Sequence, residues 1–553
     1  MARSLARDLA LALAVALALT LAAGAVMALR TATEQSWLPA GFYRLAVRTA
    51  WDRFDTWLPL AAGAALAVTA LAQAIRRWQF RPSRIRPGGP LALLALVAGL
   101  RAGTAIEARY TASGPNLLLI SIDTLRADHL GTYGYALPTS PTIDARLAGE
   151  GVTFTDVYSQ SPKTTPSHMT MLTSLYPSVH GVELWENGRP AHVLNPTVHT
   201  LAEVLKNAGY ATAAFTGGAQ VDPARGFDQG FDLYTVGGQR RRALRWLGRY
   251  RWERFFVFYH TYDVHDPYLP PDEYIRMFDP DYSGRVLDAV HRLRAEGSMS
   301  EAEWEGLSRR FWASVDRSDP RAVHFVERLY DAGIRRMDQE TVRPLLDKLD
   351  QLGLARNTLV VFTSDHGEAF GEHGHFMHDD LYVGTLHVPL ILRLPGALPA
   401  GLRVGSDGSR LGSRARLIDV MPTVLGLLGV PAPPTLQGQS LTPFLRSEFA
   451  GTLDLGGAVS EYSNGRVFES LREGQMAYIV DGSEERLFDL RRDPGEREDV
   501  LGAHPADAAA MRQTLERWRR NCRALALVLG PRGDTIAPSD ETARRLRALG
   551  YLE

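Results

Sequence analysis

Two apolar segments that each end in an acidic residue place the strongest constraint on how this chain can fold. The first is Asn116–Ile122, with Asp123 directly after it, and the second is Thr358–Thr363, with Asp365 and His366 close behind. Mainly apolar runs of this length are typical of strands that are buried on both faces of a parallel sheet. Because open α/β sheets bind ligands at the carboxyl ends of their strands, we expect these acidic residues and the histidine to lie near one another.

Strand-like and helix-like patterns alternate through the chain after residue 113. We expect helices at 140–149 and 200–208, and further buried strands at 211–215, 255–259 and 388–392. Alternation of this kind indicates an α/β fold, a mainly parallel sheet with helices on both faces. Residues 284–354 are charged and mostly helical in pattern, so we expect them to cover one face or to cap a site.

The segment Ser161–Gly181 supplies a third element. Prolines beside hydroxyl residues predict a loop, and helix-forming residues follow from His168 to about Leu175. A helix start leaves backbone N–H groups unpaired and carries the positive end of a dipole, which suits an anionic ester. Thr164 stands where a nucleophile would, although a hydroxyl before a helix also serves as an ordinary N-cap.

Together these segments resemble the sulfatase branch of the alkaline phosphatase superfamily. The resemblance rests on NLLLISIDTLRADHLGTYGY at 116–135, LTSLYPSVHG after the Thr164 loop, and TLVVFTSDHGEAFGEHGH at 358–375, in this order. It implies an alkaline-phosphatase-like fold with a mainly parallel sheet between helices. It also implies a small carboxy-terminal α+β subdomain, since Leu487–Pro494 resembles the strand and turn that close chains of this family.

The nucleophile position departs from the family pattern. Typical sulfatases carry a cysteine or serine that is converted to formylglycine, in the pattern Cys/Ser-x-Pro-x-Arg. Matching Pro166 to that proline puts Thr164 at the nucleophile position and His168 at the position of the substrate-binding arginine. Nothing in the sequence suggests that a threonine is converted to the aldehyde, so the resemblance implies that the Thr164 hydroxyl itself is the nucleophile.

The implied metal ligands depart from the pattern as well. The family's paired aspartates appear here as Asp123-Thr124, and the usual Asp-Asn appears as Asp365-His366. The implied ligands are therefore Asp123, Asp365, His366 and the Thr164 oxygen. An imidazole suits Zn²⁺ or Mn²⁺ better than Ca²⁺, and Zn²⁺ can lower the pKa of a coordinated hydroxyl. The alternative is that Asp365 and His366 only form hydrogen bonds at the strand end.

Several further residues match secondary positions of the family. His265, in a His-x-Pro-Tyr pattern, matches a histidine that contacts a substrate oxygen or the leaving group, and His378 falls near a substrate-binding lysine. Either is a candidate general acid, since histidine titrates near neutral pH. His265, His373 and His375 are candidates for a second metal, and Glu368 is a candidate for orienting a ligand. The alternative for each of these histidines is that it is only a polar residue of the surface, without a role in a site.

The resemblance implies a metal-dependent hydrolase or transferase of phosphate or sulfate esters that acts through a covalent Thr164 intermediate. A site of two Asp, one His and one Thr is similar to the site of the phosphatase and phosphotransferase members of the superfamily. The ester would then be part of a lipid headgroup or an envelope glycan. One alternative is a true sulfuric ester hydrolase in which threonine still serves. The other is a non-catalytic member that binds an anionic glycan or lipid.

Composition excludes some other classes. The formal net charge of −1 gives no reason to expect a nucleic-acid partner. The single cysteine, Cys522, excludes an intramolecular disulfide framework and a cysteine-rich zinc site.

The amino-terminal part predicts a membrane anchor. Leu9–Leu29 and Leu58–Ile75 are uncharged and long enough to span a bilayer, whereas Pro90–Ile106 is interrupted by Arg101. A cleaved signal peptide is the alternative for the first run. The arginines at 76–86 favour a cytoplasmic loop, so a third crossing would place the rest of the chain outside the cytoplasm, in the periplasm or the extracellular space. If Pro90–Ile106 is a surface helix instead, the rest of the chain faces inward.

We therefore expect three parts in the chain. They are a membrane anchor with two or three transmembrane helices at 1–112, a sulfatase-like catalytic domain at 113–446, and the carboxy-terminal subdomain at 447–553.

Overall fold

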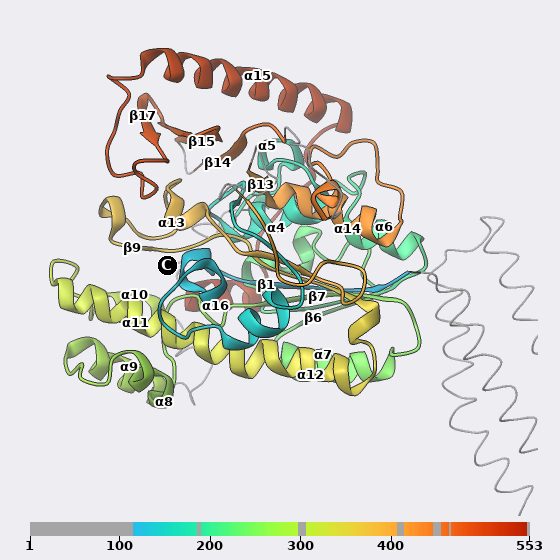
Figure 1. Ribbon diagram of the computed structural model, residues 1–553, viewed down its shortest axis with the longest axis horizontal. Helices are drawn as coiled ribbons and strands as arrows, with labels where there is room; N and C mark the ends of the chain where they lie inside the picture. Colours follow the sequence, from blue (N-terminus) through green and yellow to red (C-terminus); the bar gives the residue numbers. More distant parts are fainter. Residues whose placement is uncertain are drawn as a thin grey trace, which may run out of the picture. The chain divides into compact units, whose positions relative to one another are not determined.

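An eight-stranded sheet lies at the centre of the part of the chain that the computed structural model describes (Figure 1). That part comprises residues 114–184, 190–296, 306–405, 414–445, 455–463 and 466–549. The strand order is β12-β2-β11-β8-β1-β7-β5-β6. β1 (Asn116–Ile122) lies between β7 (Phe255–Thr261) and β8 (Thr358–Ser364) and runs parallel to both. The carboxyl ends of these strands therefore meet at one edge of the sheet.

Most of the outer strands are parallel too. β5 (Ala211–Thr216) pairs in parallel with β7 and with β6 (Leu233–Val236). On the other side, β11 (Leu390–Arg393) is antiparallel to both β8 and β2 (Val152–Phe154), and β12 (Leu402–Val404) is parallel to β2. The predicted α/β fold with a mainly parallel sheet is confirmed, and β11 is its antiparallel member.

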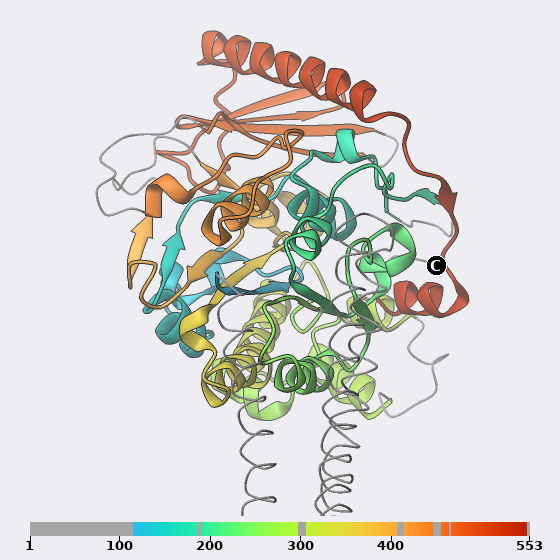
Figure 2. The same ribbon diagram turned by 90° about the vertical axis from the view of Figure 1, so that its right-hand side faces the viewer.

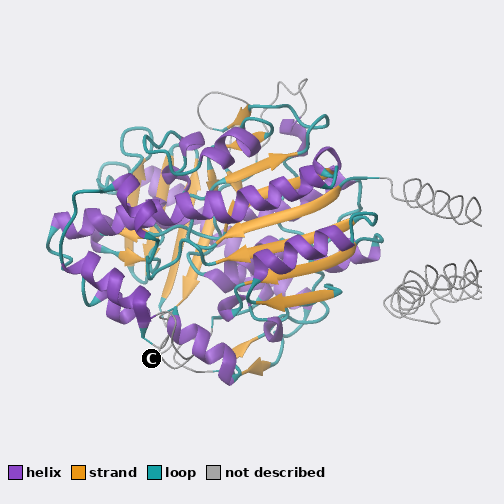
Figure 3. Ribbon diagram, turned by 90° about the horizontal axis from the view of Figure 1, so that it is seen from below, coloured by secondary structure: helices purple, strands orange, loops and turns teal. Residues whose placement is uncertain are grey.

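Side chains of β1 alternate between two apolar cores. Leu117 and Leu119 pack into one core, and Leu118, Ile120 and Ile122 pack into the other. The first core is covered by α4 (Thr164–Thr173), α5 (Pro177–His180), α6 (Leu201–Asn207) and α14 (Val420–Leu428). The second, which Figure 3 views from outside, is covered by α7 (Gln239–Arg249), α8 (Asp272–Phe278), α9 (Arg285–Glu296), α10 (Leu307–Trp312), α11 (Pro320–Met337) and α12 (Arg343–Gln351). A strand between two such layers must be mainly apolar, as this one is apart from Asn116 and Ser121.

A second, antiparallel sheet occupies the region in which a carboxy-terminal subdomain was expected. Its strands are β14 (Ala458–Ser463), β15 (Val467–Glu473), β16 (Met476–Asp481) and β17 (Glu484–Asp489), in sequence order. The long helix α15 (Pro505–Leu529) lies over this sheet, and α16 (Asp540–Ala548) follows near the described end of the chain (Figure 2). The buried Arg472 pairs with Glu496 and donates to the Leu381 carbonyl, which ties this sheet to the preceding part of the chain.

Short elements connect the layers. The small strand pairs are β3 (Val157–Tyr158) with β13 (Ala415–Arg416), β4 (Ala191–His192) with β18 (Thr535–Ile536), and β9 (Ala369–Phe370) with β10 (Phe376–Met377). The four-residue helix α13 (Val383–Leu386) precedes β11.

One local prediction is wrong in a way that matters for the site. The prolines were expected to hold a loop as far as His168, but α4 already begins at Thr164 and contains Pro166 in its first turn. Proline is tolerated there because the first turn of a helix needs no backbone N–H donors. Thr164 is therefore the first helical residue rather than a loop residue.

The predicted membrane spans Leu9–Leu29, Leu58–Ile75 and Pro90–Ile106 lie outside the described residues. Within residues 114–549, as far as the structure describes them, no helix combines the length and hydropathy that a bilayer crossing requires.

Candidate functional site

The three segments singled out in the sequence meet at the carboxyl edge of the central sheet. Asp123 directly follows β1, and Asp365 and His366 follow β8, whose Ser364 is paired in register with Ile122. The first turn of α4 brings Thr164 to the same place, with its Oγ1 3.3 Å from His366 Nε2. These four side chains are fully buried. The structure thus brings together the residues predicted as metal ligands and nucleophile.

Asp123, Asp365 and His366 have the geometry of a metal site. Each residue offers one potential metal-ligand atom, and these three atoms lie within 4.8 Å of one another. Asp123 Oδ1 and Asp365 Oδ2 are buried and accept no hydrogen bond. A buried carboxylate oxygen without a donor is costly, and a cation between these oxygens would satisfy both. Two carboxylates and one imidazole therefore fit a divalent metal.

The electrostatics of the site favour the same interpretation. Burial raises the pKa of Asp123 to about 7, and burial together with the neighbouring Asp123 carboxylate raises the pKa of Asp365 to about 7. Burial also lowers the pKa of His366 well below its usual value. A divalent cation would lower the pKa of both aspartates again, because it binds ionised carboxylates. It also needs the neutral imidazole that the lowered pKa of His366 provides.

His168 lies one turn after Thr164 and is the fifth residue of α4. Its Nδ1 is 2.9 Å from the Thr164 carbonyl oxygen, and its Nε2 is 2.9 Å from Ser121 Oγ. It also lies 3.3 Å from Asp365 Oδ2, and burial lowers its pKa to about 4. These contacts give the ring a role in holding the first turn of α4 against β1. Its role in binding substrate stays a prediction.

The other predicted histidines fall into two groups. The ring of His378 lies 4.6 Å from that of His366 and 5.6 Å from that of His265, so both predicted candidates for general acid belong to the cluster of histidines next to His366. His373 instead stacks on Tyr382, with ring centroids 3.7 Å apart. The group of potential metal donors among the described residues includes neither His265, His373 nor His375, and a second metal stays a prediction.

Two supports of the site were missed by sequence reasoning. His260, the sixth residue of β7, places Nε2 3.2 Å from Asp123 Oδ2. Asp266 holds His265, whose Nδ1 is 2.7 Å from the Asp266 carbonyl oxygen and 3.2 Å from Oδ1. Oδ2 of the same carboxylate accepts hydrogen bonds from Ser308 Oγ and Trp312 Nε1. Since acceptors face Nδ1 of His265, the proton of the neutral ring belongs on Nδ1 and Nε2 is left as the acceptor.

Glu368 is fully buried, and burial raises its pKa well above the usual value, with the nearby Asp266 adding to the effect. The predicted role of Glu368 in orienting a metal ligand stays a prediction. The signal for Asp266 was its place next to His265, whereas Ser308 and Trp312 lie in a helical segment with no recognisable motif.

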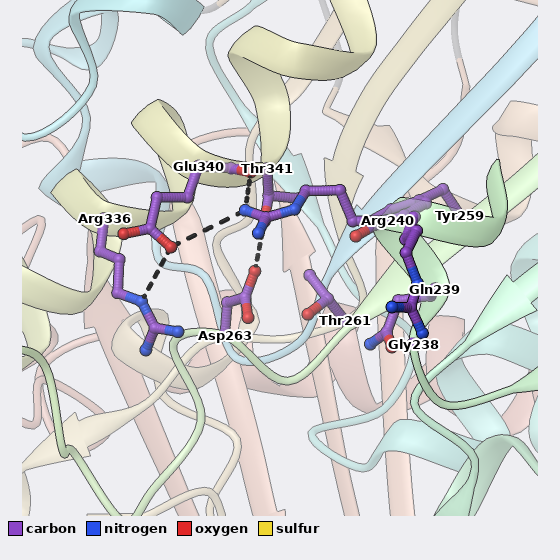
Figure 4. A pocket seen from close by; sticks show the side chains of 10 residues that line it. Gly238, Gln239, Arg240, Tyr259, Thr261, Asp263, Arg336, Glu340 and Thr341 are labelled. Atoms are coloured by element: carbon purple, nitrogen blue, oxygen red, sulfur yellow. Dashed lines mark hydrogen bonds and ion pairs between the residues drawn. The ribbon is translucent and has the colours of Figure 1, made fainter. Parts of the chain in front are cut away.

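Two pockets open beside the loop that follows β7. The smaller, about 370 Å³, is shown in Figure 4. Its charged groups are largely paired with one another, because Arg240 and Arg336 both contact Glu340, and Thr341 donates to Asp263. The larger, about 560 Å³, includes His265 in its wall.

Comparisons with known proteins agree with this arrangement. A family model described as "Sulfatase" matches residues 115–430. Arylsulfatase K of Mus musculus is 26% identical over 434 residues, which cover 67% of this chain and 73% of that protein. An N-acetylglucosamine-6-O-sulfatase of Bacteroides thetaiotaomicron is 24% identical over 461 residues, covering 68% of this chain and 80% of that protein.

Solved structures show the same fold. The phosphonate monoester hydrolase of Agrobacterium radiobacter has a TM-score of 0.55 at 24% identity, covering 74% of this chain and 96% of that one. A structure in complex with the substrate D-glucosamine-2-N,6-O-disulfate has a TM-score of 0.59 at 21% identity, covering 76% of this chain and 99% of that one.

The raised pKa values of the two aspartates predict how the stability of the metal-free protein depends on pH. A carboxyl group whose pKa rises from 3.8 to about 7 on folding binds more protons in the folded state over that range. The contribution of this carboxyl pair to the free energy of unfolding of chelator-treated protein should therefore fall as pH rises from about 4 to about 7, whereas the lowered pKa values of His168 and His366 contribute in the opposite direction. Thermal unfolding of wild type and of Asp365→Asn isolates the carboxyl contribution, because the stability of wild type relative to the variant should fall over this pH range.

The matched control is Asp347→Asn, which changes a carboxylate that is 58% exposed at the surface. It should keep the wild-type pH dependence. Equal pH dependence in wild type and Asp365→Asn would show that the buried pair does not carry this titration.

Proposed function

The chain belongs to the sulfatase family, whose model covers residues 115–430, and from this we propose that it cleaves sulfate or phosphate esters through a covalent intermediate at Thr164. It is a sulfatase-family hydrolase with an alkaline-phosphatase-like fold. The observation that carries the proposal is the position of Thr164 Oγ1, 3.3 Å from His366 Nε2 beside the buried carboxylates Asp123 and Asp365.

The residues of the site suggest a sequence of steps. A divalent metal held by Asp123, Asp365 and His366 would supply Lewis-acid chemistry and favour the deprotonated Thr164 hydroxyl. Thr164 Oγ attacks the sulfur or phosphorus atom, and the bond to the alcohol oxygen breaks. The departing oxygen takes a proton, which His265 can hold on Nε2 because Asp266 fixes its other nitrogen.

A second step completes the reaction. Water, or an acceptor alcohol in a transferase, attacks the same sulfur or phosphorus atom, and the bond from that atom to Thr164 Oγ breaks. The attacking oxygen loses a proton, and a proton restores the Thr164 hydroxyl. Lys163 and His378 lie next to Thr164, are nearly buried, and are the candidates to contact the non-bridging ester oxygens. The first turn of α4 adds the positive end of its dipole.

Different observations support a sulfate ester and a phosphate ester as the substrate. The named relatives are sulfatases, which favours a sulfate ester. The unmodified Thr164 hydroxyl and the imidazole of His366 favour a phosphate ester, because a metal and an alkoxide together suffice for phosphoryl transfer. We propose an ester of a lipid headgroup or of an envelope glycan as the natural substrate.

The nucleophile is tested with purified protein and 4-nitrophenyl sulfate, 4-nitrophenyl phosphate and bis(4-nitrophenyl) phosphate. Thr164→Ala should lower kcat/KM by about 10³-fold or more, because removal of a nucleophile leaves only binding and electrostatic catalysis. Mass spectrometry of quenched reactions should find the sulfuryl or phosphoryl group on the peptide that contains Thr164.

Thr165→Ala is the control, since the Thr165 hydroxyl already donates to the Gln220 carbonyl and should not be needed for chemistry. Full activity in Thr164→Ala would exclude the covalent mechanism. Metal binding without hydrolysis of any of the esters would favour the alternative, a non-catalytic protein that binds an anionic glycan or lipid.

For the metal we propose Zn²⁺ or Mn²⁺ rather than Ca²⁺, because His366 supplies an imidazole where calcium sites use oxygen. Elemental analysis of the purified protein should find about one such ion per chain. His366→Asn should lower its zinc or manganese content and raise its relative affinity for calcium, whereas His373→Asn should change neither. Calcium alone in the wild-type protein would contradict the ligand argument.

For the location we propose a membrane-anchored protein whose catalytic domain lies outside the cytoplasm. The support is the pair of uncharged runs, the arginine-rich segment at 76–86 and the third apolar run at 90–106. A periplasmic phosphatase reporter fused after Arg109 should be active, and a reporter that requires the cytoplasm should be inactive at the same junction. The opposite pattern would place the site inside the cell.

A further inference from the structure

One side of α7 forms a strongly basic surface. The helix has 11 residues and contains no acidic residue. Its arginines are Arg240, Arg241, Arg242, Arg245 and Arg249. Arg240 pairs with Glu340, whereas Arg241, Arg245 and Arg249 follow one another at intervals of one turn and are exposed. Trp246 is buried on the other side of the helix. Since the formal net charge of the whole chain is −1, this surface is a local concentration of positive charge.

The neighbouring helix α12 does not neutralise this surface. Its exposed acidic residues, Asp347 and Asp350, both pair with Arg146. Its basic residue Lys348 lies against α7, because a Cβ placed on Gly248 would be 3.8 Å from Lys348 Cε. The field at the exposed side of α7 is therefore positive.

An exposed aromatic side chain follows the helix. Trp252 is 62% exposed, and the Arg251 guanidinium lies 5.0 Å from the centroid of its ring. Glu253, which is also exposed, is the acidic residue next to it. Tryptophan is favoured at the boundary between membrane and water, where its ring lies at the level of the headgroups. Arginine binds phosphate groups through its planar guanidinium.

The chain enters the described region beside this surface. A Cβ placed on Gly114, the first described residue, would lie 3.7 Å from Arg254 Nη1. β1 and β7 are parallel and start at the same edge of the sheet, so Gly114 and Trp252 both lie near that edge. Residues 107–113 connect Gly114 to the apolar run at 90–106. A connection of this length reaches about 25 Å at most.

We propose that this basic surface binds a bilayer that contains anionic lipids. The surface consists of Arg241, Arg242, Arg245, Arg249, Arg251 and Trp252. The inference rests on the proposed membrane anchor, which would keep a bilayer within reach, and it adds the lipid charge that the catalytic domain recognises. The attraction of arginines to an anionic leaflet falls off within about 10 Å of the lipid surface, so a short connection is what makes it effective. Such contact would fix the orientation of the catalytic domain relative to the bilayer.

Hydroxyl-radical footprinting of the full chain tests this proposal, because the radicals oxidise exposed tryptophan and aliphatic side chains. The protein is reconstituted in vesicles of phosphatidylcholine alone and in vesicles of equal parts phosphatidylcholine and phosphatidylglycerol. Trp252 should be oxidised about fivefold more slowly in the mixed vesicles, and a high concentration of sodium chloride should abolish the difference. Leu527 of α15, which is 84% exposed on the opposite side of the central sheet (Figure 1), should be oxidised equally in both.

Substitution of two arginines tests the role of charge. Arg241→Gln/Arg245→Gln should raise the oxidation of Trp252 in the mixed vesicles about threefold or more. The matched control is Arg520→Gln/Arg523→Gln, which removes two exposed arginines from α15 and should leave the protection of Trp252 unchanged. Thermal unfolding in detergent establishes that both variants are folded.

The outcomes separate this inference from the proposed anchor and the proposed chemistry. Extraction of the chain from the mixed vesicles by alkaline carbonate would reject the anchor, and protection of Trp252 in those vesicles before extraction would still support the basic surface. Equal oxidation of Trp252 in both kinds of vesicle, in a chain that resists extraction, would overturn the surface and leave the anchor. Hydrolysis of the 4-nitrophenyl esters is measured in detergent and is independent of both results.

Two further results would also overturn the inference. Protection of Leu527 in place of Trp252 would identify α15 as the side that contacts the bilayer. Protection of Trp252 by heparin in detergent, with none from phosphatidylglycerol, would identify an anionic glycan as the partner.

Discussion

The close approach of two buried carboxylates is the interaction on which the rest of the site depends. Asp123 and Asp365 are fully buried because each follows directly on a strand whose two faces are covered. The surrounding groups satisfy part of their need for donors: His260 approaches Asp123, and the backbone N–H groups of Thr124 and His366 donate to Asp365 Oδ1. One oxygen of each carboxylate has no hydrogen-bond donor, and this is why the site fits a cation.

The same constraint explains the position of Thr164, the proposed nucleophile. α4 must deliver Thr164 to a point that two strands have already made acidic, and a helix start is one of the few backbone features that carries partial positive charge. His168 fixes this start by linking the Thr164 carbonyl oxygen to Ser121 of β1. The position of the hydroxyl is thus determined by the sheet and the helix together rather than by a mobile loop.

Sequence reasoning could predict what lies within contiguous motifs and little beyond them. Sequence patterns could predict the positions of Asp123, Asp365 and His366. The apolar strands indicate where the edge of the sheet lies, and these residues follow the ends of those strands. Thr164 followed from the spacing to Pro166, although the helix was expected to start later. The clamp of Ser308 and Trp312 on Asp266 was not predictable, because it joins residues about 40 positions apart through side chains alone. For the same reason the larger pocket beside the loop after β7, whose wall includes residues of four separate helices, leaves no pattern in the chain.

The direction of β1 determines the edge of the sheet from which substrate can reach the site. The described chain begins at Gly114, which lies against Tyr210 and Arg254 at the amino-terminal edge of the sheet, whereas Thr164 lies at the carboxyl edge. The 7 residues of β1 separate these edges by roughly 23 Å at the usual rise of an extended strand. Substrate must therefore reach Thr164 from the carboxyl edge, where the segments that follow β1, β7 and β8 form the site.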